Sequence, residues 1–151
     1  MRSKFSVPIL VADDDLDDCE MIREALLESR LLNEIKFVHD GEQLISLLHR
    51  ERVLPQEQRN LPGLILLDLN MPKMDGREVL KEIKKHPELY QIPIVVLTTS
   101  EAEEDILRSY NLGANSFITK PIEFKTLVQV MRDLGRYWFE IVELPNFKRD
   151  Q

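Results

Sequence analysis

Short apolar runs alternate with longer amphipathic segments along most of the chain. The runs are too short for core helices and are rich in aliphatic and β-branched residues, so they predict β-strands. They cover residues 9–12, 35–38, 64–67, 94–97 and 116–118. The first, third and fourth runs are apolar at every position, which is typical of parallel strands that are covered on both faces.

Apolar residues recur at helical spacing between and after these runs, which predicts one helix after each strand. The expected apolar faces are Ile22, Ala25, Leu26 and Ser29; Leu44, Ile45 and Leu48; Val79, Leu80 and Ile83; Ile106, Leu107 and Tyr110; and Leu127, Met131 and Leu134. This alternation predicts an α/β fold, a doubly wound five-stranded parallel sheet with five helices. Such sheets carry their ligand sites at the carboxyl ends of the strands.

Two stretches depart from this alternation. Residues 50–62 predict a polar, proline-containing loop that is longer than the usual connection of about 2–6 residues. The last helix begins near Glu123 and continues past the sheet before it stops near Pro145. We therefore expect one domain over residues 1–134, which includes the long loop, and a helical extension over residues 135–151.

Composition narrows the class of protein. The chain has 151 residues, enough for one domain, and 27 acidic residues outnumber 20 basic ones for a net charge of −7. This balance argues against nucleic-acid binding, which requires Lys and Arg to neutralise phosphates. No apolar run approaches the roughly 18 residues of a membrane span, and the N-terminus lacks the apolar stretch of a secretory signal. We expect a cytoplasmic protein with no membrane partner.

The spacing of the cysteine and the histidines indicates neither a disulfide nor a metal site. A single cysteine, Cys19, excludes an internal disulfide, and its helical spacing from Ile22 predicts a small buried side chain. His39, His49 and His86 lie far apart in the sequence without the paired spacing of zinc ligands. We therefore expect no zinc site.

Acidic residues follow two of the predicted strands. Asp13 and Asp14 come after the first apolar run, and Asp68 comes after the third. If both strands are central, these three carboxylates converge at one sheet edge, where their mutual repulsion calls for a hard divalent cation such as Mg²⁺. Helix capping is the alternative for the other acids of the first run, but it does not explain Asp68. Those capping candidates are Asp15, Asp17 and Asp18.

The fourth and fifth strands end in other polar groups. Thr98 ends the fourth strand, and Lys120 follows the fifth. Alone, each residue is more often an ordinary surface side chain. Together with the carboxylates, a hydroxyl and an ammonium group at one sheet edge are the components of a phosphoryl-transfer site.

These residues resemble the signature of the response-regulator receiver domain. The matching positions are Asp13-Asp14, Asp68 with Asn-Met-Pro at 70–72, Thr98, and Lys120-Pro121, and the resemblance extends from about Val7 to Arg132. It implies a flavodoxin-like receiver fold, to which the apolar pattern of this chain adds an extended last helix. The long loop and the C-terminal tail are the departures from the family pattern.

The resemblance also implies the roles of the site residues. Asp68 is the expected phosphoacceptor, which takes a phosphoryl group from a phosphohistidine. The expected cofactor is Mg²⁺, bound by the side chains of Asp14 and Asp68 and by the backbone carbonyl of Asn70, with Asp13 reaching it through water. Lys120 is expected to pair with Asp68 and then with the phosphate.

Four further positions are assigned by the same resemblance. Thr98 is expected to hydrogen-bond the phosphate, and Phe117 to rotate inward as the switch aromatic. A plain core aromatic is an equal alternative for Phe117. Asn70 and Ser100 occupy the positions at which the family tunes its dephosphorylation rate.

The implied function is a stand-alone two-component response regulator, a phosphoacceptor switch and not a turnover enzyme. One alternative is a dehalogenase-like phosphatase, which needs a second Asp where this chain has Asn70. Others are an inert interaction module, and a receiver that serves as a phosphorelay intermediate or phosphate sink for another sensor kinase.

The C-terminal tail points to partners. Residues 137–145, taken with the long loop, are similar to the single-domain regulators that are paired with phytochromes, so a phytochrome-type sensor histidine kinase is the expected donor. The heptad spacing of the last helix and its aromatic cluster predict a homodimer. A helix that folds back over its own domain is the alternative. The expected contact residues are Leu134, Tyr137, Trp138, Phe139 and Ile141.

Overall fold

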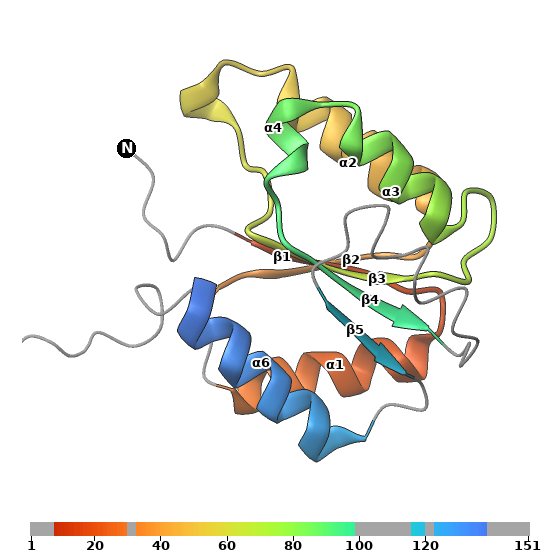
Figure 1. Cartoon of the computed structure of the whole chain (residues 1–151), viewed down its shortest axis with the longest axis vertical. Helices are drawn as coiled ribbons and strands as arrows, with labels where there is room; N and C mark the ends of the chain where they lie inside the picture. The colour runs from red at the N-terminus through yellow and green to blue at the C-terminus, as the bar shows by residue number, and fades with distance from the viewer. Residues whose placement is uncertain (1–7, 30–32, 99–115, 120–122, 139–151) are drawn as a thin grey trace, which may run out of the picture.

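A computed structural model shows a three-layered α/β fold (Figure 1). The structure describes residues 8–29, 33–98, 116–119 and 123–138. A five-stranded sheet forms the middle layer in the order β2-β1-β3-β4-β5, and every neighbouring pair is parallel. This confirms the predicted fold class. The strands are β1 (Ile9–Ala12), β2 (Ile35–Val38), β3 (Leu64–Asp68), β4 (Ile94–Thr98) and β5 (Ser116–Thr119).

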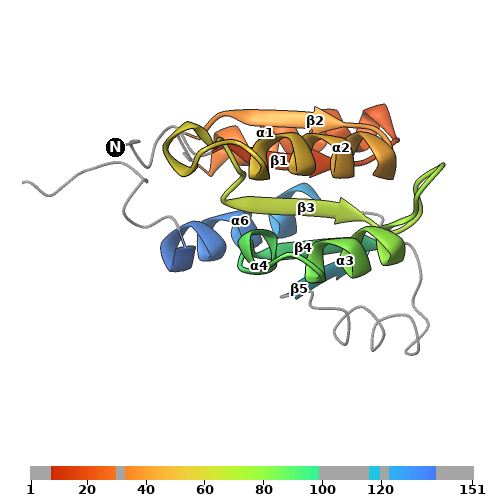
Figure 2. The same cartoon turned by 90° about the horizontal axis from the view of Figure 1, so that it is seen from above.

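The helices cover both faces of the sheet, as Figures 1 and 2 show. On one face lie α1 (Leu16–Glu28) and α6 (Phe124–Trp138). On the other lie α2 (Gly41–Arg52), α3 (Gly76–Lys84) and the short α4 (Pro87–Tyr90). The helix that we expect around Ile106 lies outside the described residues, and so does the part of the C-terminal extension from residue 139 onward.

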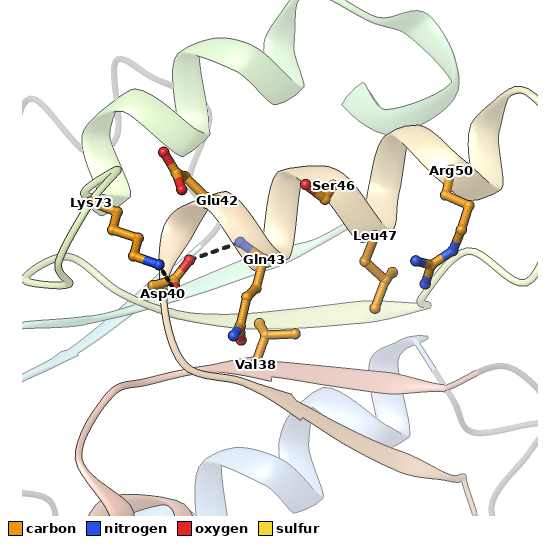
Figure 3. Close-up of a pocket in the computed structure, with 8 residues that line it drawn as sticks. All are labelled: Val38, Asp40, Glu42, Gln43, Ser46, Leu47, Arg50 and Lys73. Atoms are coloured by element: carbon orange, nitrogen blue, oxygen red, sulfur yellow. Dashed lines mark hydrogen bonds and ion pairs between the residues drawn. The ribbon is translucent and has the colours of Figure 1, made fainter.

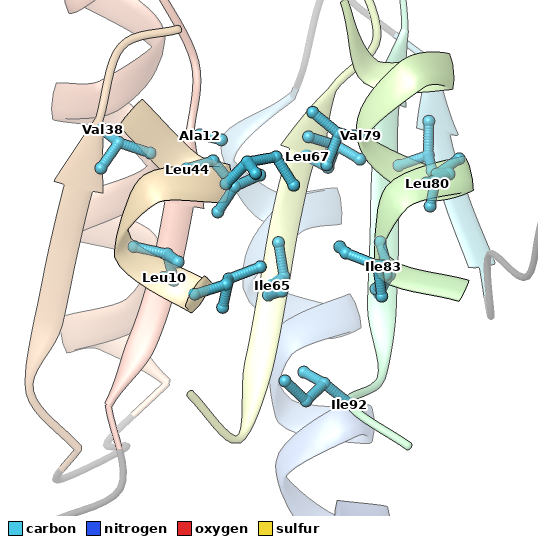
Figure 4. Packing of buried hydrophobic residues seen from close by; sticks show 14 of the residues in the cluster. Leu10, Ala12, Val38, Leu44, Ile65, Leu67, Val79, Leu80, Ile83 and Ile92 are labelled. Carbon is cyan, nitrogen blue, oxygen red and sulfur yellow. The ribbon is translucent and has the colours of Figure 1, made fainter. Parts of the chain in front are cut away.

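Two apolar layers hold the helices to the sheet. Leu10 and Ile65 face α2 and α3, where they pack in one cluster with Leu44 and Ile83 (Figure 4). The alternate strand residues face α1 and α6 and form a second cluster. The central strands β1 and β3 and residues 94–97 of β4 are buried throughout. Their continuous apolar runs therefore contribute much of the hydrophobic stabilisation of the fold. Full burial of each such side chain contributes about 1.5–3 kcal/mol.

The predicted loop 50–62 needs a correction at its start. Helix α2 continues to Arg52 and is capped by Val53, so the connection begins there and contains a single 3-10 turn at Gln56–Gln58. The basic side chains of the last turn of α2 favour the added residues, because cations stabilise the negative end of the helix dipole. Pro55 then prevents continuation of the helix.

The short helix α4 is a second feature that the apolar pattern does not reveal. Helix α3 ends at Lys84, and Pro87 begins α4 at its first helical position, where the missing N–H and fixed φ of proline are favourable. Within the described ranges, no helix combines the length and the apolar character that a membrane span requires.

Candidate functional site

Three carboxylates meet at the carboxyl edge of the sheet. Ala12 of β1 pairs with Leu67 of β3, so Asp13 and Asp68 are the next residues on neighbouring strands. Carboxylate oxygens of Asp13, Asp14 and Asp68 all lie within 4.8 Å of one another. Asp13 and Asp68 are 0% and 3% exposed, whereas Asp14 is exposed to solvent. The cluster is therefore a pocket with a buried floor and an open side.

The turn after β1 separates the acids of the first run into two groups. The Asp13 amide donates to the Val38 carbonyl at 3.1 Å and continues the pairing with β2. The Asp13 side chain accepts from the Asp15 amide at 2.9 Å. Asp15 itself caps α1 by accepting from the amides of Asp17 and Asp18 at 2.9 and 3.2 Å, which confirms the capping interpretation for this residue. The carboxylates of Asp13 and Asp14 instead belong to the pocket.

The turn after β3 holds the third carboxylate. Asp68 is the last residue of β3, and its side chain accepts from the Asn70 amide at 3.0 Å. The Leu69 amide donates to the Leu97 carbonyl at 2.9 Å, so β4 supports the strand at the point where it ends. These bonds fix Asp68 at the pocket floor and bring the Asn70 backbone to the same edge.

The loop between β3 and α3 is fastened to the start of α2. Asp40 caps α2 through the Gln43 amide at 2.8 Å, and one of its oxygens lies 3.7 Å from the Lys73 ammonium (Figure 3). Lys73 adopts a left-handed backbone with φ 68°. A Cβ at Gly41 would overlap with the Met74 carbonyl, so only glycine permits this close approach. These contacts of Lys73 and Met74 with the start of α2 hold the loop that contains Asn70, and we call them the clamp.

Sequence reasoning missed this clamp. Asp40 followed three residues later by Gln43 is a helix-start signal that identifies the cap. Nothing in the spacing shows that Lys73 and Met74 pack against that helix start, because the path of the β3–α3 loop decides it.

The other predicted site residues are placed only in part. Thr98 ends β4 and pairs with Thr119 of β5, one position beyond the partner of Asp68, so its backbone lies at the same edge. Phe117 lies in β5 opposite Val96. Lys120 and Ser100 lie outside the described residues.

The predicted contact residues for a dimer are also placed in part. Leu134, Tyr137 and Trp138 belong to helix α6, whereas Phe139 and Ile141 lie outside the described residues. Earlier in this helix, Leu127 and Met131 are fully buried in the layer shared with α1. The first half of the predicted apolar seam therefore packs within the domain.

The donor set of the pocket fits a hard divalent cation. Carboxylate oxygens are the ligands that Mg²⁺ and Mn²⁺ prefer, while softer metals prefer nitrogen and sulfur. Burial of two carboxylates side by side is unfavourable, and a cation bound beside them would offset their charge.

Comparisons with known proteins identify the family of this chain. The family model for the response regulator receiver domain matches residues 9–132. Response regulator Rcp1 of Synechocystis sp. is 41% identical over 137 residues, which cover 91% of this chain and 92% of Rcp1.

Solved structures give the same result. The phosphorylated cyanobacterial phytochrome response regulator RcpA is 40% identical with a TM-score of 0.76 and covers 93% of this chain and 99% of its own. The Mn²⁺-bound form of Rcp1 is 40% identical with a TM-score of 0.74, over 91% and 98% of the two chains. The chain therefore belongs to the response regulator receiver domain family and is related to the phytochrome response regulators.

Proposed function

We propose that this receiver is a phosphoacceptor switch in which Asp68 accepts a phosphoryl group from a sensor histidine kinase in a Mg²⁺-dependent reaction. The observation that carries the proposal is the convergence of Asp13, Asp14 and Asp68 within 4.8 Å, with Asp68 at the buried floor. Two of the similar structures support it, because RcpA is a phosphorylated regulator and Rcp1 a Mn²⁺-bound one.

The Asp68 carboxylate is the nucleophile. One of its oxygens forms a bond to phosphorus as the N–P bond of the phosphohistidine breaks, and the imidazole leaves with the electron pair. The Asn70 amide, 3.0 Å from Asp68 Oδ1, holds the carboxylate plane in place during attack. Later attack of water on the acyl phosphate restores the carboxylate and ends the signal.

Asp14, Asp68 and the Asn70 carbonyl would hold the ion directly, and Asp13 would hold it through water. When bound, Mg²⁺ supplies the positive charge that offsets the negative charge of the phosphoryl oxygens. Buried Asp13 also has a structural role, because its hydrogen bond from the Asp15 amide fixes the turn that presents Asp14.

The switch lies at the ends of β4 and β5. Lys120 pairs with Asp68 and then with the phosphate, and Thr98 donates its hydroxyl to the phosphate. Phe117 follows Thr98 inward, so that a protein-binding surface or a dimer changes. Asn70 and Ser100 set the phosphate lifetime. The position of Thr98, next to the strand that carries Asp68, supports this assignment.

Acetyl phosphate provides the test of the phosphoacceptor. With Mg²⁺ we expect one acid-stable, base-labile phosphoryl group per chain in intact-mass spectra, and none after chelation or in Asp68→Asn. Asp17→Asn is the matched control, because it removes an exposed acid of the same run that only serves the start of α1. Equal labelling of Asp68→Asn and wild type would show that the nucleophile is wrong. Steady turnover of phosphate esters without an adduct would show that the protein is a phosphatase.

The upstream partner is proposed to be a phytochrome-type histidine kinase, which the similarity to Rcp1 and RcpA supports. A phosphotransfer profile against all sensor kinases of the source organism tests it. The expected result is fastest transfer from the phytochrome-type kinase. Preferential transfer from an unrelated sensor kinase would reject this partner and leave the phosphoacceptor proposal intact.

A further inference from the structure

Two histidines and a carboxylate meet on the α2–α3 face, away from the acidic pocket. His49 lies in α2, Glu82 in the last turn of α3, and His86 caps α4. Helix α2 starts at the pocket edge, and His49 lies eight residues after Gly41, roughly 12 Å further along the helix axis. The group is therefore separate from the Asp13–Asp68 site.

The three side chains converge closely. His49 Nε2 and His86 Nε2 lie 3.3 and 3.4 Å from the same oxygen, Oε2 of Glu82. The two imidazole rings are 5.0 Å apart and nearly perpendicular at 89°, so their nitrogens approach from different directions. All three potential ligand atoms lie within 4.8 Å of one another, and each side chain is between 21% and 33% exposed, so an ion can enter from solvent.

The backbone fixes this arrangement. Glu82 lies in the last turn of α3, and the turn that follows this helix brings the side chain of His86, four residues later, to 3.4 Å from the Glu82 carboxylate. The His86 amide donates to the Ile83 carbonyl at 3.2 Å, and the His86 carbonyl accepts from the Tyr90 amide at 2.9 Å. Packing of α2 against α3 then brings His49 opposite this pair.

These distances match a tetrahedral metal site. Zinc binds imidazole nitrogen and carboxylate oxygen at about 2.0–2.2 Å, so two ligands of a tetrahedron are separated by about 3.3–3.5 Å. The two nitrogen-to-oxygen separations in the cluster, 3.3 and 3.4 Å, fall in that range. A glutamate carboxylate is ordinarily ionised at neutral pH, so Glu82 offers this site a negatively charged oxygen ligand.

We propose that His49, Glu82 and His86 form a second metal site, which takes a transition-metal dication of the Zn²⁺ type. Two imidazoles and one carboxylate suit Zn²⁺, Ni²⁺ or Cu²⁺, whereas the oxygen-only acidic pocket suits Mg²⁺. Three protein ligands leave a fourth position for water. Spacing in the sequence predicts no zinc site, because the long separation between His49 and Glu82 conceals the cluster.

A hydrogen bond from Arg52 to His49 competes with metal binding. Its Nε donates to His49 Nδ1 at 2.9 Å, so the ring hydrogen of His49 is on Nε2 and points to Glu82. Binding of an ion at Nε2 moves that hydrogen to Nδ1, with no net change in protons for a neutral ring. The Arg52 donor must then leave His49, while its Nη1 retains Glu88 at 3.3 Å. Removal of Arg52 therefore favours the metal.

Zinc titration of the full chain tests the site. Isothermal titration calorimetry in saturating Mg²⁺, which occupies the acidic pocket, is expected to show one Zn²⁺ per chain. His49→Gln and His86→Gln should each weaken binding by more than about tenfold. His39→Gln, a change in the third histidine of the chain, should bind like wild type. Thermal unfolding without metal confirms that each variant is folded.

Two variants separate the proposed site from its rivals. Arg52→Met is expected to tighten Zn²⁺ binding by roughly three- to tenfold, because one competing hydrogen bond and one positive charge are lost. Asp14→Asn should leave Zn²⁺ binding unchanged. Absence of binding to wild type, or binding that survives both histidine changes and is lost in Asp14→Asn, overturns the proposal. Neither outcome affects the phosphoacceptor function.

Discussion

At the scale of single residues, the carboxylates of the acidic pocket repel one another, and a bound cation reduces this repulsion. Asp13 and Asp68 are both buried, and their oxygens are at most 4.8 Å apart. Two like charges at this distance repel by about 1–3 kcal/mol when the effective dielectric is that of a partly solvated site. A bound cation, or the loss of one of the two charges, removes this repulsion.

Asp13→Asn tests this repulsion. The amide keeps the shape of the side chain and can still accept from the Asp15 amide, so loss of one charge is expected to stabilise the metal-free protein by about 1–3 kcal/mol. The same change should weaken the stabilisation that Mg²⁺ provides, because a member of its ligand shell is altered. Urea unfolding with and without Mg²⁺ measures both effects.

Asp17→Asn is the control for Asp13→Asn, since it removes one acid from the same run outside the pocket. It should change neither the metal-free stability by more than a few tenths of a kcal/mol nor the effect of Mg²⁺. If Asp13→Asn destabilises the metal-free protein, charge repulsion is not what limits its stability.

At the scale of elements, the sequence predicts the buried strands but not the contacts between segments that lie far apart in the chain. The predicted strand starts at residues 9, 35, 64, 94 and 116 all agree with the structure. For β1, β3 and β4 the reason is burial on both faces, which gives unbroken apolar runs. The convergence of acids at the ends of β1 and β3 follows from parallel order alone. The contact of Lys73 with Asp40 and that of His49 with Glu82 join distant segments, and no local pattern encodes them.

The contact between the β3–α3 loop and the start of α2 predicts an effect on both stability and phosphorylation. Gly41→Ala places a methyl group against the Met74 carbonyl, a backbone atom that moves only with the loop. We expect a loss of about 1–3 kcal/mol in unfolding free energy and slower labelling by acetyl phosphate, because the loop carries Asn70. Ser46→Ala, an exposed change in the same helix, is the control and should alter neither quantity.

Asp40→Asn decides whether the ion pair or the close backbone contact fastens the loop. Asparagine caps helices as well as aspartate, so this change removes only the attraction to Lys73, whose side chain is 60% exposed. Asp40 is buried, but the Lys73 ammonium is solvated and lies 3.7 Å away, so we expect the pair to contribute at most about 1 kcal/mol and labelling to remain near wild type. Labelling that falls more in Asp40→Asn than in Gly41→Ala would assign the fastening to the ion pair.

At the scale of the whole molecule, helix α6 is longer than the sheet that it covers. Its 15 residues from Phe124 to Trp138 extend about 22 Å, whereas strands of four or five residues extend about 13–17 Å. Leu127 and Met131 are buried within the domain. Leu134 and Trp138 continue the same heptad spacing toward the end of the helix, and a continued apolar seam at this end favours a second copy of the chain.

Sedimentation equilibrium of the full chain and of a variant that ends at Arg136 tests this homodimer. The full chain is expected to sediment as a dimer and the shortened chain as a monomer, because the aromatic cluster at 137–139 is removed. Leu127 and Met131 remain in the shortened chain, so its acidic pocket should still accept phosphate from acetyl phosphate. Retained labelling then separates loss of the interface from loss of the fold. An unchanged mass with retained labelling would mean that the end of α6 covers its own domain, and the output of the switch would have to be a contact with another protein.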